Sequence, residues 1–182
     1  MEKTYGGSDE DYAFSIIATK DGGYIFAGWT RSNDGDVNNN HSPMWWTDVW
    51  VVKIDKDGNI IWEKTYGGSD DDGASAIIAA PGGGYIVAGW TESNDGDVSE
   101  NHGKVDVWIL KLDEDVNMIW QKTLGGSNDD IAYSIAATSD GGYIVVGDTG
   151  SNDGDVSGWH EGYTSYDNSP SPDFWIIKLG WK

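Results

Sequence analysis

The sequence predicts an all-β protein assembled from three similar repeats. Residues 2–37 align with residues 63–98 without a gap, and 27 of the 36 positions are identical. A third copy begins at Gln121, and the copies are spaced by 61 residues (Gly6 to Gly67) and then by 58 residues (Gly67 to Gly125). Self-similarity at such a period is typical of repeat architectures. We therefore expect one repeat domain over residues 1–182, with repeats at about 6–66, 67–124 and 125–182.

Each repeat predicts four short strands. In the first repeat, residues 12–19 and 24–30 flank Asp21-Gly22-Gly23, which is a tight hairpin signal. Residues 48–55 are rich in β-branched and aromatic side chains, as strands prefer. Asp57-Gly58-Asn59 then turns the chain into a fourth strand at residues 60–66. No segment carries a clean helical period, so we expect strands without helices.

The central strands are apolar on both faces, as at Ile16-Ile17 and Val51-Val52, which indicates stacked sheets. Four-stranded sheets repeated around an axis describe a β-propeller, which has about four to eight blades. Residues 1–5 match the fourth strand of a repeat, whereas the third repeat stops after its third strand at 174–179. We therefore expect two chains to form a homodimer that closes a six-bladed ring. A β-trefoil or a β-prism, either of which closes as a monomer, is the alternative.

Composition narrows the range of partners. The net charge is −20 with one arginine, which disfavours nucleic acid and anionic membranes because both are polyanions. No apolar run approaches the ~18 residues of a spanning helix, so membrane insertion is not expected. The chain has no cysteine, and repeat sequence follows Met1 without a signal peptide. We expect either a cytoplasmic chain or one cut from a longer secreted protein.

Four motifs resemble a known repeat family. They are YGGS at residues 66–69, the GGYIVAGWT stretch at 83–91, SNDGDV at 93–98 and DVWILK at 106–111, each with counterparts in the other copies. In these motifs the chain is similar to the β-propeller-type repeats found in large secreted or surface proteins of bacteria and archaea. The resemblance covers nearly the whole chain. It implies an extracellular or cell-surface propeller and no single activity.

The acidic SNDGDV loops are the candidate metal sites. Hard cations such as calcium prefer several carboxylate, amide and carbonyl oxygens on a tight loop. The alternative is an Asx turn, in which Asp and Asn cap backbone amides. If calcium is the cofactor, its ligands are Asp34, Asp36, Asp95, Asp97, Asp153 and Asp155.

Two further polar residues recur in every repeat. An aspartate follows three residues after the serine of GGS, and we expect it to anchor a hydrogen bond between neighbouring blades. One histidine follows each SNDGDV loop, and we expect it to be a polar loop residue. These positions are Asp11, Asp72 and Asp130, and His41, His102 and His160.

The aromatic residues fall into two groups. Trp50, Trp108 and Trp175 lie inside predicted strands and are expected in the core between blades. A second group lies in the long loops and does not repeat. Aromatic side chains in such places stack on sugars or anchor protein interfaces, although packing against a blade edge is the alternative. The candidate ligand-binding residues are Trp45, Trp46, Trp159, Tyr163 and Tyr166.

These observations favour a non-enzymatic binding or scaffold propeller that contacts glycan or protein through its long-loop face. Variable loops on a rigid scaffold are where specificity usually lies. A glycoside hydrolase is the alternative, since such enzymes need two carboxylates at a defined separation. However, an active site is asymmetric, whereas these motifs repeat almost unchanged. A purely structural or engineered repeat fragment without a ligand is the third hypothesis.

Overall fold

The computed structural model describes residues 2–41, 45–163 and 171–180, and these form three antiparallel β-sheets without a helix. The prediction of an all-β repeat fold is confirmed. The described residues form no helix that is long and apolar enough to cross a membrane. The first sheet contains β1 (Asp11–Ala18), β2 (Tyr24–Thr30), β3 (Asp48–Ile54) and β4 (Ile60–Tyr66). The second contains β5 (Asp72–Ala79), β6 (Tyr85–Thr91), β7 (Asp106–Leu112) and β8 (Met118–Leu124), and the third contains β9 (Asp130–Ala137), β10 (Tyr143–Thr149) and β11 (Asp173–Leu179).

Hairpin chemistry sets the strand boundaries. In the β1–β2 turn, Thr19 N–H donates to Gly23 O at 2.9 Å and Gly22 N–H donates to Thr19 O at 3.0 Å. Gly22 has a φ of 85°, which a residue with a side chain rarely adopts. The predicted strand at 12–19 is displaced by one residue to Asp11–Ala18, because Thr19 already belongs to this turn. The strand at 48–55 ends at Ile54, because Asp55 caps the next turn by accepting from Asp57 N–H and Asn59 N–H, each at 2.8 Å.

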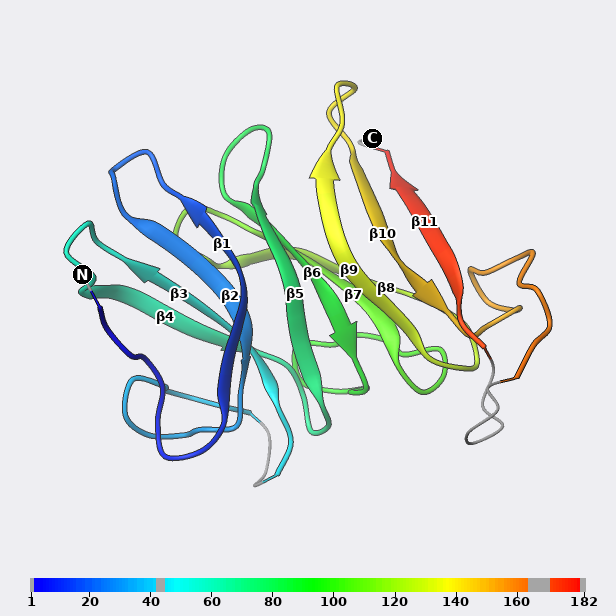
Figure 1. Cartoon of the computed structure of the whole chain (residues 1–182), viewed down its shortest axis with the longest axis horizontal. Helices are drawn as coiled ribbons and strands as arrows, with labels where there is room; N and C mark the ends of the chain where they lie inside the picture. The colour runs from blue at the N-terminus through cyan, green and yellow to red at the C-terminus, as the bar shows by residue number, and fades with distance from the viewer. Residues whose placement is uncertain (1, 42–44, 164–170, 181–182) are drawn as a thin grey trace.

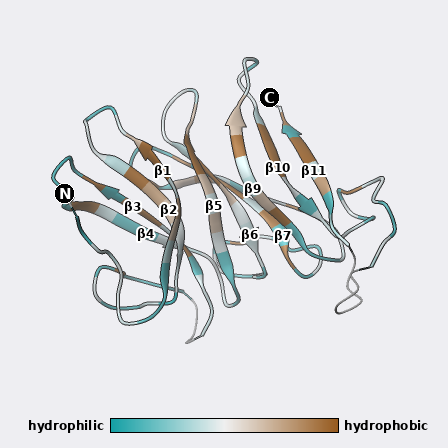
Figure 2. Ribbon diagram, viewed as in Figure 1, coloured by the Kyte–Doolittle hydropathy of each residue, from teal (hydrophilic) through white to brown (hydrophobic). Residues whose placement is uncertain are grey.

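The sheets stack in an open row, in chain order, with apolar residues between them (Figures 1 and 2). The substantial contacts between sheets join the first to the second and the second to the third. Between the first two sheets, the core includes Ile25, Val51, Ile77, Trp108 and Leu110. Between the second and third sheets, it includes Ile86, Ile109, Ile135, Tyr143 and Val145. A strand in the middle of this row therefore buries both of its faces, as the sequence predicted.

Strand order places the connections at two opposite edges of the sheets. Because successive strands in each sheet are antiparallel, the β1–β2 and β3–β4 turns lie at one edge, the short-turn end, and the β2–β3 loop lies at the other, the long-loop face. Figure 1 shows the short β1–β2, β5–β6 and β9–β10 turns at the top and the long β2–β3 and β10–β11 connections at the bottom. The long loops of all repeats therefore gather on one side.

Candidate functional site

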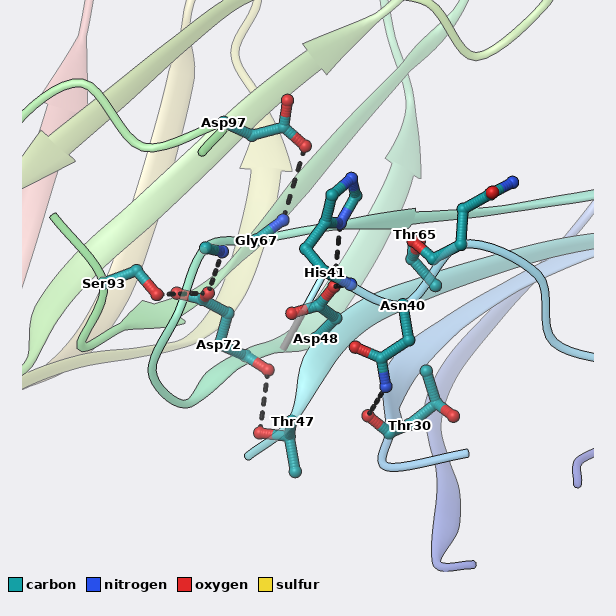
Figure 3. Close-up of polar contacts among 12 residues, drawn as sticks. Thr30, Asn40, His41, Thr47, Asp48, Thr65, Gly67, Asp72, Ser93 and Asp97 are labelled. Atoms are coloured by element: carbon teal, nitrogen blue, oxygen red, sulfur yellow. Dashed lines mark hydrogen bonds and ion pairs between the residues drawn. The ribbon is translucent and has the colours of Figure 1, made fainter. Parts of the chain in front are cut away.

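A carboxylate in each SNDGDV loop fastens that loop to the GGS segment of the same repeat. Asp95 Oδ1 accepts a hydrogen bond from Ser69 N–H at 2.8 Å. Asp97 Oδ2 accepts one from Gly67 N–H at 3.4 Å (Figure 3), and Asp97 N–H donates to Gly67 O at 2.9 Å. Gly68 leaves the room for this contact, because an added Cβ would lie 2.4 Å from Asp95 Oδ1. The same bond, at 2.7 Å, joins Ser8 to Asp34 and Ser127 to Asp153.

These contacts are relevant to the calcium prediction. The Asp95 oxygen faces an N–H donor, whereas a calcium ion requires several oxygen lone pairs directed at one point. Across residues 2–41, 45–163 and 171–180, no group of three or more His, Asp or Glu side chains is placed to hold a metal ion. The arrangement therefore performs turn capping. Calcium at the six SNDGDV aspartates stays a prediction.

An aspartate at the start of the first strand of each repeat joins three segments; it is buried in the second and third repeats and half-buried in the first. Asp130 accepts hydrogen bonds from Gly126 N–H at 2.8 Å, from Ser151 Oγ at 2.9 Å and from Thr149 Oγ1. We expected this side chain to bond a neighbouring sheet, but its partners belong to its own repeat, since the GGS segment and the SNDGDV loop fold over it. The bond between sheets comes instead from the backbone, because Asp130 N–H donates to Val105 O at 2.8 Å.

Burial changes the acidity of the corresponding carboxyl in the second repeat. Asp72 is fully buried, and its Oδ2 accepts from Gly68 N–H at 2.8 Å and from Ser93 Oγ at 2.7 Å (Figure 3). Its Oδ1 has no hydrogen-bond partner among the described residues. Burial raises the pKa of Asp72 to about 7, against the opposing effect of its hydrogen bonds. A carboxyl of this kind carries a proton below neutral pH.

Each loop histidine pairs with the aspartate that begins the third strand of its repeat. His41 Nδ1 lies 2.9 Å from Asp48 Oδ2, and His41 N–H donates to the same oxygen at 2.7 Å (Figure 3). The hydrogen bond to Asp106 raises the pKa of His102. The sequence predicts polar loop histidines but does not reveal their aspartate partners. The equivalent pairs are His102 with Asp106 and His160 with Asp173.

The candidate aromatic residues differ in exposure. Trp45 is 76% exposed, Trp46 42% and Tyr163 56%, whereas Trp50 and Trp108 of the strands are buried. Trp159 is half-buried, and its Nε1 donates to Ser171 O at 2.9 Å, so it also fastens its own loop. Trp175 is half-buried in β11, at the end of the row. Tyr166 lies outside the described residues. The first and third long loops therefore present exposed aromatic rings.

The outer face of the third sheet is uncovered at β11. Phe174 is 94% exposed and Ile176 is 64% exposed. Their equivalents in β7, Val107 and Ile109, are fully buried because the third sheet packs over them. Figure 2 shows hydrophobic residues in the middle of β11, although this strand belongs to the last sheet of the row. An apolar surface whose equivalent in the second sheet is buried is thus exposed to solvent.

The opposite end of the row is uncovered at β1. Ile16 is 60% exposed, whereas its equivalent in the second sheet, Ile77, is 2% exposed. The N-terminal segment covers part of this face, since the Tyr5 ring lies 5.6 Å from the ring of Phe26 between centroids. The first sheet therefore lacks the neighbour that the second and third sheets have.

The N-terminal segment contacts the first sheet in the same way as β4 contacts the second. Tyr5 Oη donates to Gly58 O at 2.9 Å and Lys3 Nζ donates to the same oxygen at 2.8 Å. In the next repeat, the β4 residues Tyr66 and Lys64 make the same two bonds to Val116 O. Residues 2–5 are thus held against the first sheet as β4 is held against the second. The third sheet, in turn, is described with three strands and has no fourth strand beside β11.

No protein-family model and no curated protein matches this chain. The similarity to secreted propeller-type repeats therefore rests on the four motifs alone.

Proposed function

We propose that the chain is a non-enzymatic binding scaffold, in which two copies close a six-bladed β-propeller that presents its long loops on one face. The observation that carries this proposal is the complementarity of the two uncovered ends. At one end lie residues 2–5, which correspond in sequence to a fourth strand and have no sheet of their own, and at the other end lie three strands without a fourth. A second copy supplies each missing part.

The contact between copies repeats one that the chain already makes twice internally. In the first sheet, Val51 pairs with Lys64 across the β3–β4 ladder, and in the second sheet Ile109 pairs with Lys122. By the same register, Ile176 of one copy pairs with Lys3 of the other. Such an end-to-end contact covers edge strands and apolar faces that otherwise promote aggregation.

A tryptophan hydrogen bond adds specificity to this register. Trp50 Nε1 donates to Glu63 at 2.9 Å, and Trp108 Nε1 donates to Gln121 at 2.8 Å. In the proposed ring, Trp175 Nε1 donates to Glu2 of the second copy. The acceptor is a side chain with a carbonyl or carboxylate oxygen in all three cases.

The open row of sheets favours blades over a β-trefoil or a β-prism. In those folds, three repeats of one chain surround a common axis and close without a partner. Here the sheets follow one another in a row, with a first and a last member that each expose an apolar face. Propellers contain about four to eight blades, which two chains supply and one does not.

The long-loop face is the proposed binding surface. Trp45, Trp46 and Tyr163 are exposed there on loops that differ between repeats. Exposed aromatic rings on a rigid scaffold suit stacking on sugar rings or anchoring of a protein partner. The motif resemblance supports an extracellular or cell-surface location. Glycoside hydrolysis is the less favoured alternative, because the carboxylates that recur in the motifs are used as turn caps.

Introduced cysteines test the register of the ring directly, because the natural chain has none. Lys3→Cys combined with Ile176→Cys should give a disulfide-linked dimer on oxidation. The matched control, Lys3→Cys with Ile177→Cys, places one thiol on the other face of β11 and should link poorly. The two positions lie at opposite ends of the row (Figure 1), so a bond within one chain is not expected. Equal cross-linking of both variants, or none, would contradict the proposal.

A further inference from the structure

The β5–β6 turn departs from the corresponding turns of the other repeats. In the first repeat, Asp21 at this turn forms an ion pair with Lys53 at 2.7 Å. In the third repeat, Asp140 forms one with Lys178 at 2.8 Å. The second repeat has Gly82 at this position. The lysine remains, but the carboxylate that should pair with it is missing.

Lys111 is therefore a buried cation without an anionic partner among the described residues. It is 6% exposed, and its Nζ donates to Gly83 O at 2.7 Å. Burial lowers the pKa of this ammonium group. An ammonium group has three N–H donors, so one bond to a carbonyl leaves donor capacity unused.

A cavity of about 890 Å³ opens beside this lysine, between the second and third sheets at the short-turn end. Trp120 lies directly opposite Lys111 in the β7–β8 register, and both residues line the cavity. Ile119 adds apolar surface, and Glu114 contributes a carboxylate acceptor. A cation, an indole side chain and a hydrogen-bond acceptor thus line one space.

We propose that this cavity binds a hexuronate, that is, a sugar ring bearing a carboxylate. The sugar carboxylate takes the place of the missing aspartate at Lys111, the ring lies against Trp120, and a hydroxyl donates to Glu114. A neutral sugar would leave Lys111 unpaired, and a simple carboxylate would leave the indole uncovered. The site does not depend on ring closure or on the loop face, because all its lining residues belong to one chain at the short-turn end.

Titration of the full-length protein with glucuronate, followed by calorimetry and by Trp fluorescence, tests the site. Glucose and acetate are the matched probes, and each should bind at least about tenfold more weakly than glucuronate. Lys111→Gln should weaken glucuronate binding by about ten- to a hundredfold, the range expected for one charge-assisted hydrogen bond. Lys53→Gln is the control, because Lys53 is already paired with Asp21, and binding should be unchanged.

A graft of the first repeat's turn provides a second test. The triple variant A80T/P81K/G82D supplies Lys111 with an internal carboxylate and should abolish glucuronate binding while the fold, checked by circular dichroism, persists. If the graft unfolds, Lys111→Gln decides. The proposal is overturned if the protein does not bind glucuronate, if glucose or acetate binds equally well, or if Lys111→Gln binds like the unchanged chain.

Discussion

Ile176→Ala should weaken the association of two copies, because a second copy covers this side chain in the proposed ring. Ile176 is 64% exposed in one chain, whereas its equivalents Val51 and Ile109 are fully buried between sheets. Complete burial of such a side chain is worth about 1.5–3 kcal/mol, so covering the exposed part contributes roughly 1–2 kcal/mol. A closed dimer has this contact twice, which gives about 2–4 kcal/mol. Each 1.4 kcal/mol is a factor of about ten, so the dimer Kd should rise roughly thirtyfold to several hundredfold.

Ile61→Ala is the matched control for this experiment. Ile61 is 51% exposed, but its equivalent in the second sheet, Ile119, stays 58% exposed although that sheet has neighbours on both sides. Ring closure therefore does not cover this position, and the substitution should leave the Kd unchanged. Sedimentation equilibrium over a wide concentration range measures both variants. Equal dissociation constants for Ile176→Ala and Ile61→Ala would refute the argument that β11 contacts a second copy.

Three further outcomes follow from the site. Because burial raises the pKa of Asp72 from 3.8 to about 7, the folded chain holds a proton that the unfolded chain loses, so stability should fall as pH rises from about 4 to 7. Asp72→Asn should remove up to about 4 kcal/mol of this loss. Urea unfolding of the variant and of the unchanged chain at about pH 4 and pH 7 measures the loss, and an equal loss of stability in both proteins would contradict the prediction. Asp95→Ala should cost about 1 kcal/mol in urea unfolding by uncapping Ser69 N–H, whereas Asp95→Asn keeps an acceptor and should cost less. If Asp95→Ala and Asp95→Asn destabilise the chain equally with calcium but unequally without it, the loop binds the ion. Replacing Trp45 and Trp46 by alanine should abolish signals on a glycan array with a change in stability within about 0.5 kcal/mol, and retained signals would exclude these rings as the binding surface.

Local chemistry explains which features of this fold can be predicted from sequence. The Asp21-Gly22-Gly23 hairpin and the apolar strands act over a few residues, so β1 and β2 were located to within one residue. The uncovered ends were also predictable, because residues 1–5 match the fourth strand of a repeat and residues 125–182 match only its first three strands. The partners of Asp130 were not, since they depend on how a loop about twenty residues away folds over the strand.

The histidine pairs illustrate the same limit. His41 and Asp48 are seven residues apart, whereas His160 and Asp173 are thirteen apart, so no fixed spacing marks the pair. Only the geometry of the strand end brings each pair together. A signal for the short-turn cavity was present, however. Gly82 breaks the repeat at a position where the other two copies have aspartate, and an alignment of the repeats with their lysines would have revealed it.

The mass of the protein in solution tests the central claim most directly. Two chains that close one ring should give a particle of twice the 19.8 kDa chain mass in light scattering. Folding and association should occur together, because an isolated chain exposes Phe174 and Ile176. A mass of two chains that is lost when residues 1–5 are deleted is the result that the account predicts. A stable, well-folded particle with the mass of one chain would contradict it and would favour a fold that closes by itself.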